Sequence, residues 1–552
     1  MTAEHSLAPD LLLINGKILT VDAQDRVAHA VAVAGGRILA VGDTREILPL
    51  RGRGTEVIDL QGRTLLPGLT DPHLHLADKG TSEMHNLDCR DFYTDVRSIS
   101  QILDRFAARA AELAEGTWLV AHGSPMQDFR MPEGRFPTRW ELDRAAPRHP
   151  AAISFGAHIT IVNSLGLARA GITRETPDPA GGSIERDPGT GELTGKLRER
   201  AQLLVKKVLT PYSHEQLKAG ILHEAAKCLE RGVTTIHDIV IANRAVRAYQ
   251  ELWQEGRLPL RVSLLIRVIE AEIVPESLLN LGLFTGFGND WLKLGGIKLS
   301  IDGGITGRNA AFSEPYVGEP HNCGLIRIPQ EELEDVAGRY HRAGHRLCIH
   351  AIGDVAFDMV LRALDRILSA HPRPGHRHRI EHMGNWLCTP ERVALMRRHG
   401  ILPVPNIAYL HFVGDSILAC LGPERMRDAF PLKTLLGAGF PLTSGSDAPG
   451  YWPVDVLRDI GAAVARRTWM GQTLAPGEAL SIRDAIRMYT VNAAYAGFEE
   501  RIKGSVEPGK LADLAVLAED PFAVPPEKLK EIPVDLTIVD GRVAYRREEA
   551  WR

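Results

Sequence analysis

Short apolar runs separated by turn residues mark both ends of the chain. Near the start, the run at 11–14 precedes Asn15-Gly16, and near the end the run at 536–539 precedes Asp540-Gly541. Asn-Gly and Asp-Gly pairs between apolar runs are typical of β-hairpin turns. Each end alone offers too few strands to be stable. We therefore expect the two ends to pair into one composite β-sandwich, made of residues 1–65 and 498–552.

In the centre, residues 66–497, apolar strand-like runs alternate with stretches of helical periodicity. The helical stretches are 216–231, 330–343, 356–370 and 482–496. The strand candidates, besides a strand at His73, are 152–155, 233–237, 262–266, 296–299, 347–350, 379–382, 402–404 and 442–445. This alternation indicates βα units around a parallel sheet. The predicted fold is therefore α/β, a (β/α)₈ barrel of the TIM type beside the sandwich.

One segment of the centre breaks the alternation. From His85 to about Lys206 the chain carries aromatic residues, prolines and glycines without steady βα spacing. We interpret residues 85–206 as an insertion that follows the first barrel strand and forms a lid.

Composition narrows the class of protein. At 552 residues the chain exceeds the size at which a single core stops growing, so two or more domains are expected. It has 65 Lys and Arg against 69 Asp and Glu, so no basic field would attract nucleic acid or an anionic membrane. The expected partner is a small-molecule substrate. We also expect a homodimer or a larger homo-oligomer, because most soluble oligomers are symmetric assemblies of one chain.

Other bulk features point to the cytoplasm. The first residues lack a basic leader, and no apolar run approaches the ~18 residues of a membrane span. The six cysteines are widely spread and form no Cys-x-x-Cys pair, so we expect free thiols rather than a zinc or redox site.

Two histidines one residue apart follow the first apolar run of the centre. Pro67-Gly68 breaks that run, and His73 and His75 then share one face of a strand. Two imidazoles placed in this way chelate a divalent metal ion. Taken alone, such a pair is more often a surface strand with two polar residues facing water.

Other residues of ligand type stand at the ends of later strand candidates, namely Lys298, His350, His382 and Asp447. Singly, each has a structural explanation: a core histidine, an ion-pair lysine or a turn cap. In a (β/α)₈ barrel, however, the carboxyl ends of all strands converge on one mouth. We therefore predict one metal site built from these four residues together with His73 and His75.

The mixture of residues suits hydrolysis. Imidazoles and a carboxylate bind zinc, the expected metal, and also manganese or iron. Two such ions would polarise a carbonyl and lower the pKa of a bridging water, with Asp447 as the general acid/base. Lys298 is the odd member, because an ammonium cannot bind a cation. Carbamylation by CO₂ would turn it into a carboxylate able to bridge two metals.

The motifs resemble one known family. They are residues 67–75, 297–304, 350–354, 379–382, 445–449 and 504–513, and they run in order through nearly the whole chain. In these motifs the chain resembles the metal-dependent amidohydrolase superfamily and, within it, the YtcJ-like group (amidohydrolase family 3), which includes N-substituted formamide deformylases. The resemblance implies a barrel with a composite sandwich, a two-metal site and a carboxylated lysine at Lys298.

The chain departs from the family pattern outside the metal positions. Relatives often have Asp-Gly-Ser, Arg-Thr-Ala and Ala-Gln where this chain has Asp302-Gly303-Gly304, Arg308-Asn309-Ala310 and Met383-Gly384. These changes put in doubt which acyl or amine group the pocket accepts.

Several further residues are candidates for the pocket. His158 resembles a family pattern in the insertion and is expected to reach over the metals. Aromatic and cationic residues that follow strand ends are expected to wall the pocket, although surface and core roles compete: Arg308, Tyr316, Trp386, Tyr409 and Trp452. Asp302, Glu381 and Asp238 are expected to orient imidazoles. His237 is interpreted as a barrel-mouth residue rather than a ligand.

The favoured function is a metal-dependent hydrolase that cleaves a non-peptide amide C–N bond, in an N-substituted formamide or a related N-acyl amide. Carbamates and cyclic amides stay open as substrates. One alternative is a deaminase with a single metal, held by His73, His75, His350 and Asp447. Two metals and a carbamylated Lys298 would favour hydrolysis, and one metal with an unmodified lysine would favour deamination. A non-catalytic descendant of the fold is the third possibility.

Overall fold

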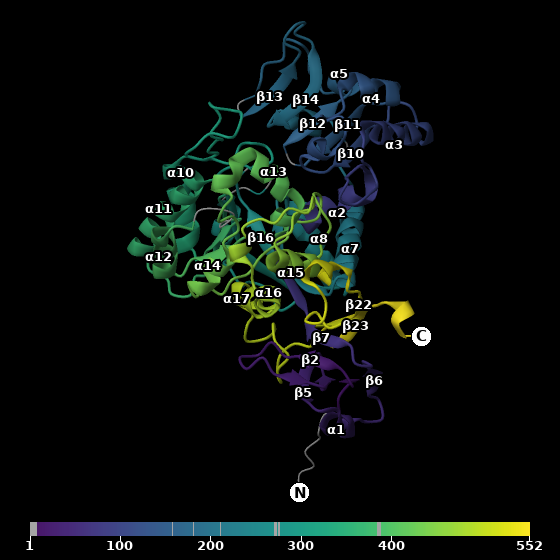
Figure 1. The fold of residues 1–552 in the computed structure, drawn as a ribbon, viewed down its shortest axis with the longest axis vertical. Helices are drawn as coiled ribbons and strands as arrows, with labels where there is room; N and C mark the ends of the chain where they lie inside the picture. The colour runs from purple at the N-terminus through teal and green to yellow at the C-terminus, as the bar shows by residue number, and fades with distance from the viewer. Residues whose placement is uncertain are drawn as a thin grey trace.

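The structure is a computed structural model that describes residues 8–156, 158–179, 181–209, 211–269, 273, 276–382 and 388–551. Three parts are stacked along the long axis of the molecule. In Figure 1 the insertion lies at the top, the parallel sheet with its helices in the middle, and the sheets formed by the two ends at the bottom.

The middle part is built on one parallel sheet of seven strands, in the order β20-β19-β18-β17-β16-β15-β8. The strands are β8 (Leu69–Leu74), β15 (Val233–Val240), β16 (Arg261–Arg267), β17 (Leu292–Ser300), β18 (Leu347–His350), β19 (Arg379–Glu381) and β20 (Leu402–Val404). Nearly every residue in them is buried, as parallel strands covered on both faces require. The α/β class with a parallel sheet is confirmed.

Helices follow the strands and cover the outside of the sheet. They are α2 (Leu76–His85), α7 (His214–Glu230), α8 (Asn243–Gln254), α9 (Glu276–Leu281), α10 (Gln330–Arg342), α11 (Asp354–Ala370), α12 (Pro390–His399), α13 (Ala408–Arg425), α14 (Leu432–Gly437) and α15 (Val456–Ala465). Local signals set their ends. Ser213 caps the first turn of α7 in a capping box, and α12 ends at Gly400 with a left-handed φ of 68°.

The helix expected at 482–496 is two helices, α16 (Ile482–Met488) and α17 (Val491–Ala496). The break falls at Thr490, whose φ of −124° and ψ of −101° are not helical. The hydroxyl of Thr490 donates to the carbonyl of Ile486, a side-chain bond that competes with the helical backbone pattern.

The strand expected at 442–445 is not formed, although its segment lies where the sheet needs an eighth member. Gly445 N donates to Pro405 O at 3.3 Å, beyond the end of β20, and Asp447 N donates to His73 O in β8 at 2.9 Å. The segment therefore bridges the last and first strands. It makes too few regular backbone bonds to be a strand because the chain turns at Asp447, where φ is 60°.

The insertion has a sheet of its own, in the order β13-β14-β12-β11-β10-β9. Its strands are β9 (Leu87–Asp88), β10 (Leu119–Gly123), β11 (Ala151–Phe155), β12 (Ile159–Val162), β13 (Gly182–Arg186) and β14 (Leu193–Glu199). Helices α3 (Ile99–Glu112), α4 (Arg139–Ala145), α5 (Ser164–Arg169) and α6 (Gln202–Lys206) accompany them. The strand predicted at 152–155 as part of the central alternation belongs here, because a buried strand of a second sheet has the same local pattern. Two hydrophobic clusters form its core, so the segment is a small α/β unit.

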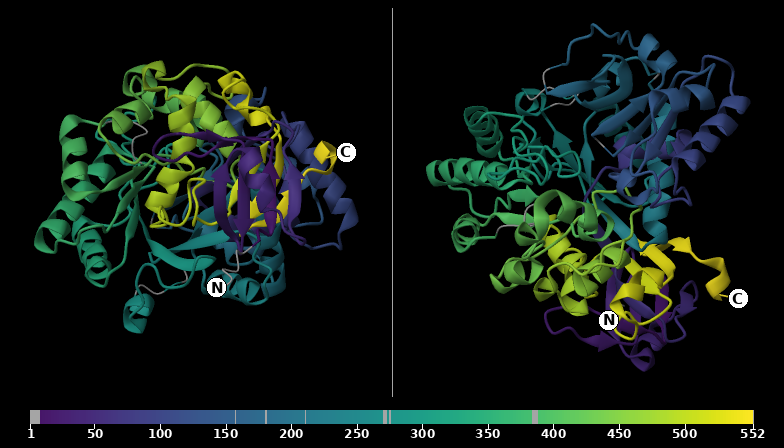
Figure 2. Two further views of the ribbon diagram at one scale, coloured as in Figure 1. Left: turned by 90° about the horizontal axis from the view of Figure 1, so that it is seen from below. Right: turned by 45° about the horizontal axis from the view of Figure 1, so that its top comes forward.

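The two ends of the chain share a sheet at the bottom. One sheet has the order β5-β4-β1-β6 and the other β23-β22-β21-β7-β2-β3. N-terminal strands are β1 (Leu11–Ile14), β2 (Lys17–Leu19), β3 (Val27–Ala28), β4 (Ala30–Ala34), β5 (Arg37–Gly42), β6 (Glu56–Asp59) and β7 (Thr64–Pro67), and C-terminal strands are β21 (Leu514–Leu517), β22 (Val534–Val539) and β23 (Arg542–Arg546). β7 pairs antiparallel with β21, and the left view of Figure 2 shows purple and yellow strands side by side. One hydrophobic cluster contains side chains of both sheets.

Within the described residues, no helix combines the length and the apolar character needed to span a bilayer.

Candidate metal centre

Four histidine rings meet where the central strands end. His73 lies in β8, His350 ends β18, and His382 directly follows β19. The ring centroids of His73 and His382 are 4.7 Å apart and those of His382 and His350 are 4.4 Å apart, in each case edge to face. His75 lies 5.9 Å from His73. The structure thus brings together the four histidines that the sequence placed at strand ends.

Asp447 joins this group from the bridging segment 442–447. Its Oδ1 lies 3.1 Å from Nε2 of His75 and 3.3 Å from Nε2 of His73. One potential ligand atom from each of His73, His382 and Asp447 lies within 4.8 Å of the other two, and all three residues are buried. Imidazole nitrogens and a carboxylate oxygen are the donor set that zinc and similar divalent ions prefer.

The backbone is in the left-handed region at two of these residues. The φ angle is 62° at His382 and 60° at Asp447, which is uncommon for residues other than glycine. Hydrogen bonds hold both conformations, because His382 N donates to Val404 O and Asp447 N donates to His73 O, each at 2.9 Å. Backbone strain that neighbouring strands maintain is typical of functional sites.

Three buried polar atoms in this group have no hydrogen-bond partner among the described residues: His73 Nε2, His382 Nδ1 and Lys298 Nζ. A buried nitrogen without a partner is costly, and native proteins rarely leave one so. The two imidazole nitrogens therefore fit a bound divalent cation. Lys298 lies in β17 and is 3% exposed, and burial lowers its pKa to about 8.

A carboxylate behind His73 orients its ring. His73 Nδ1 and Glu381 Oε2 are 2.5 Å apart, and Glu381 also accepts from Arg379 Nε at 2.6 Å. An ionised carboxylate only accepts, so Nδ1 carries the hydrogen and Nε2 turns its lone pair toward Asp447. Burial opposes ionisation of Glu381, but Arg379 and His73 hold its pKa well below the usual range.

The two other expected orienting carboxylates act mainly on the backbone. Asp302 accepts from the N–H groups of Ile352 at 3.1 Å and Gly353 at 2.8 Å, and its Oδ1 lies 3.3 Å from His350 Nε2. Asp238 accepts from the N–H of Leu76 at 2.6 Å, at the start of α2. Asp238 therefore fixes the chain after His75, and its hydrogen-bond partners among the described residues are backbone N–H groups and the Tyr249 hydroxyl rather than an imidazole.

Asp71 is a structural residue that the sequence analysis missed. Its carboxylate accepts from Ser446 N at 3.1 Å, from Ser446 Oγ at 2.5 Å and from His73 N at 3.2 Å. Burial raises the pKa of Asp71 to about 6. The residue ties β8 to the segment that carries Asp447. Its place in the motif at 67–75, two residues before His73, was the signal in the sequence.

The cluster opens into a cavity of about 180 Å³ at the carboxyl ends of the strands. Among the predicted pocket residues, His158, Tyr409 and Trp452 line it. Two arginines that the sequence analysis missed, Arg267 at the end of β16 and Arg327, line it as well.

The remaining predicted pocket residues lie elsewhere. Arg308 lines an adjoining cavity and pairs with Glu319 at 2.8 Å. Tyr316 is 2% exposed and donates its hydroxyl to Ala310 O at 2.9 Å, so it packs inside the loop and does not face the cavity. Trp386 lies outside the described residues.

Two aromatic residues hold Asp447 in place. The hydroxyl of Tyr409 donates to Asp447 Oδ2 at 2.5 Å, and Trp452 Nε1 donates to Ser446 O at 2.8 Å. The rings of Tyr409 and Trp452 meet edge to face with centroids 5.1 Å apart. The sequence predicted these residues as cavity walls, and their bonds to the segment around Asp447 add a second role.

His237 lies in the interior of the sheet rather than at its mouth. It is fully buried in β15, and Arg379 Nη1 donates to its Nδ1 at 3.0 Å. Burial and then Arg379 lower its pKa well below the usual value, so it is a neutral core residue.

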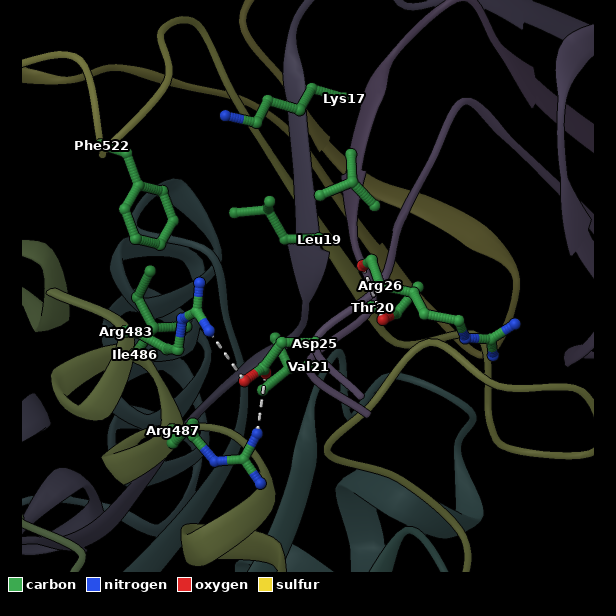
Figure 3. A pocket seen from close by; sticks show the side chains of 11 residues that line it. Lys17, Leu19, Thr20, Val21, Asp25, Arg26, Arg483, Ile486, Arg487 and Phe522 are labelled. Atoms are coloured by element: carbon green, nitrogen blue, oxygen red, sulfur yellow. Dashed lines mark hydrogen bonds and ion pairs between the residues drawn. The ribbon is translucent and has the colours of Figure 1, made fainter. Parts of the chain in front are cut away.

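A separate pocket lies between the N-terminal strands and α16 (Figure 3). Asp25 faces Arg487 at 2.9 Å and Arg483 at 3.5 Å, and Lys17 pairs with Asp520 at 2.5 Å. The described residues that line it include no histidine or cysteine. With its charges paired and no potential metal ligand of those types, this pocket is not the candidate site.

Comparisons with known proteins agree with this geometry. The sequence profile of the amidohydrolase family matches residues 56–545. YtcJ of Bacillus subtilis (strain 168), a protein named as an amidohydrolase, is 32% identical over 96% of this chain and 98% of its own length. The N-substituted formamide deformylase of Arthrobacter pascens is 29% identical over 98% of each chain. A crystal structure of an uncharacterized metal-dependent hydrolase from Pyrococcus horikoshii superposes with a TM-score of 0.74 at 26% identity, covering 94% of this chain and 99% of that one.

Proposed function

The chain belongs to the amidohydrolase family, and from this premise we propose that it is a metal-dependent hydrolase that cleaves a non-peptide amide C–N bond in a small molecule. The observation that carries the proposal is the buried group of His73, His382 and Asp447, of which His382 and Asp447 line a cavity. His73 Nε2 and His382 Nδ1 are buried without a hydrogen-bond partner among the described residues. Binding of a metal ion would give both nitrogens a partner and so account for their burial.

The metal site would be formed by the residues that converge on the cavity: His73, His75, Lys298, His350, His382 and Asp447. We propose two divalent ions, with zinc as the expected metal, and a CO₂-derived carbamate on Lys298. When bound, such ions polarise the scissile carbonyl and make a water molecule more acidic. The unpartnered, buried Nζ of Lys298 supports the carbamate, because carbamylation would remove an ammonium charge that has no hydrogen-bond partner among the described residues and would add two carboxylate oxygens able to bind metal.

Side chains of the protein would then transfer the proton of the attacking water. Asp447 takes the proton of the attacking water and returns it to the departing nitrogen as the C–N bond breaks. Tyr409 occupies Oδ2 of Asp447, so Oδ1, which faces His73 and His75, is the oxygen available for this transfer. Glu381 and Arg379 keep the His73 ring in one orientation throughout.

We also propose how the parallel sheet closes and how the two ends of the chain are organised. We propose that segment 442–447 takes the place of the eighth strand and completes a (β/α)₈ barrel within residues 66–497. Residues 1–65 and 498–552 would form the composite sandwich. The bonds from Gly445 to Pro405 and from Asp447 to His73 support this closure.

For the substrate we propose N-substituted formamides or related N-acyl amides. Similarity to the N-substituted formamide deformylase over nearly the full length supports this choice. A deaminase with one metal ion is the second candidate, because within the described part of the chain only His73, His382 and Asp447 have ligand atoms within 4.8 Å of one another.

One experiment separates these candidates. Purified full-length protein is analysed for metal content and, by intact mass measurement under CO₂, for a carbamate on Lys298. It is then assayed with N-alkylformamides for formate and with aminated heterocycles for ammonia. We expect about two metals per chain, a carbamate and formate release. One metal, an unmodified lysine and ammonia release would instead establish the deaminase.

A further inference from the structure

A second cavity of about 490 Å³ adjoins the candidate site. It lies between insertion residues that include Asp128 and Phe136 and loop residues after β17 that include Thr306 and Arg308, and we call it the distal chamber. The candidate-site cavity and the distal chamber share three lining residues, which are Pro125, His158 and Thr306. A molecule held at the metal cluster therefore borders directly on the distal chamber.

His158 stands at the boundary between the two cavities. Its Nδ1 lies 3.0 Å from Glu199 Oε1, so the insertion holds the ring by a side-chain bond. The ring packs on two glycines of the loop: a Cβ added at Gly304 would lie 2.7 Å from His158 Nε2, and one at Gly307 would lie 2.6 Å from His158 Cγ. The missing side chains of Gly304 and Gly307 thus make room for His158.

One wall of the distal chamber is apolar. The rings of Phe136 and Phe155 pack with centroids 4.4 Å apart, and Phe129, which is 49% exposed, lies on the same cavity. Aromatic walls of this kind favour a flat or ring-shaped apolar group.

The cations of the distal chamber already have carboxylate partners. Lys196 lies 3.4 Å and Arg198 3.6 Å from Glu185, and Arg308 lies 2.8 Å from Glu319. Lys196 and Arg198 share the one carboxylate of Glu185, and Asp128 on the chamber wall is a third acidic group, so three cations stand against three acidic residues. With charges this close to balance, the chamber offers little attraction to an anionic group.

Asp128 differs from these residues. Its Oδ1 is buried and has no hydrogen-bond partner among the described residues. Burial also raises the pKa of Asp128, against the weaker effects of backbone hydrogen bonds and Lys196. A buried acceptor without a donor is costly, so Asp128 is the group in the chamber that gains most from a ligand.

We propose that the distal chamber binds the larger substituent of the scissile amide. This substituent is an apolar, ring-sized group whose far end donates a hydrogen bond to the Asp128 carboxylate. This inference rests on the proposed amide hydrolysis. A formamide has only hydrogen on its acyl carbon, so in that substrate class the substituent on nitrogen enters the chamber. The donor is a hydroxyl or an ammonium.

The test uses two substrates that differ by one hydroxyl, N-formyltyramine and N-formylphenethylamine, with full-length metal-loaded protein. For the wild type we expect kcat/KM to be about 10-fold higher for N-formyltyramine, which corresponds to one buried hydrogen bond. Asp128→Leu should bring this ratio to about 1. Asp95→Asn is the matched control, because the Asp95 side chain is 90% exposed on the same insertion, and it should keep the 10-fold ratio.

The outcomes are distinguishable. Equal kcat/KM for both substrates in the wild type, or an unchanged ratio in Asp128→Leu, would overturn the role of the chamber and leave the hydrolase in place. A preference for a third substrate with a carboxylate in place of the hydroxyl would also overturn it. If neither formamide is hydrolysed, the proposed function fails. Tighter calorimetric binding of N-formyltyramine that Asp128→Leu abolishes would then still support the chamber.

Discussion

The hydroxyl of Tyr409 donates to Oδ2 of Asp447 at 2.5 Å, and this bond ties the candidate general acid/base to helix α13. Asp447 sits in a strained left-handed conformation on a segment that is not a regular strand. Its carboxylate therefore depends on side-chain contacts for its orientation, and Tyr409 is the contact that fixes the oxygen facing away from His73.

Tyr409→Phe should lower kcat about 10-fold with a small change in KM. The substitution removes one hydrogen bond to a charged group and keeps the ring packed on Trp452. Steady-state kinetics on an N-alkylformamide would measure the change, and thermal unfolding would check that the fold persists. Tyr545→Phe in β23 is the control and should leave kcat as it is. Equal kcat in Tyr409→Phe and the wild type would argue against an orienting role for the hydroxyl.

Asp447→Asn should lower kcat by about 10²–10⁴-fold, the usual contribution of a general acid/base. The amide keeps the shape of the side chain and can still accept from Tyr409, but it cannot take a proton from water. Metal content measured alongside kcat separates loss of proton transfer from loss of metal. Near-native turnover in this variant would remove Asp447 from the proposed role.

Acid should destabilise the protein through buried histidines in α10 and just before β19, none of which lines the candidate-site cavity. His378 N donates to His376 Nδ1 at 2.8 Å, and His376 Nε2 donates to His399 O at 2.7 Å. His378 Nε2 similarly donates to His341 Nδ1 at 2.8 Å, since His341 Nε2 donates to the His371 carbonyl. Each ring uses one nitrogen as donor and the other as acceptor, so protonation breaks a bond.

Burial lowers the pKa of His376 to about 4, below the ~6.5 of an unfolded chain. Because the unfolded state binds the proton first, stability is full above about pH 6.5 and falls as the pH drops toward 4. One such group loses about 2 kcal/mol between pH 7 and pH 5. Urea unfolding at the two pH values measures the loss, and His376→Gln should reduce it. A free energy of unfolding that is the same at both would contradict the neutral network.

The convergence of the candidate metal ligands could be predicted from sequence because the rule behind it is topological. Once His73 and His350 are placed toward the carboxyl ends of strands in one parallel sheet, and Asp447 on the segment that bridges the first and last strands, the fold itself brings them together. Tyr316 was predicted wrongly for the opposite reason. Its distance along the chain from a strand end does not say whether its side chain faces the cavity or the inside of its own loop.

Contacts that depend on the relative orientation of two elements could not be predicted from the sequence either. The bond from Tyr409 to Asp447 requires a helix and a bridging segment to meet at one angle, and no local pattern encodes that angle. The strand at 152–155 shows the same limit at the level of the fold. The apolar run does form a strand, but this strand, β11, pairs with β10 and β12 of the insertion. The sequence of one strand does not specify which strands it pairs with.

Gly304 is one position at which the choice of substrate can be tested by a single substitution. Relatives with Asp-Gly-Ser carry a side chain there, whereas here a Cβ would lie 2.7 Å from Nε2 of His158. Gly304→Ser should therefore displace the His158 ring, raise KM for formamides several-fold and change kcat less, since Asp447 is untouched. Steady-state kinetics give both constants. The double variant Gly304→Ser/His158→Ala tests the cause: if the collision is responsible, adding the serine to His158→Ala should raise KM no further. A serine that raises KM equally with and without the imidazole would show that Gly304 acts through the loop backbone instead.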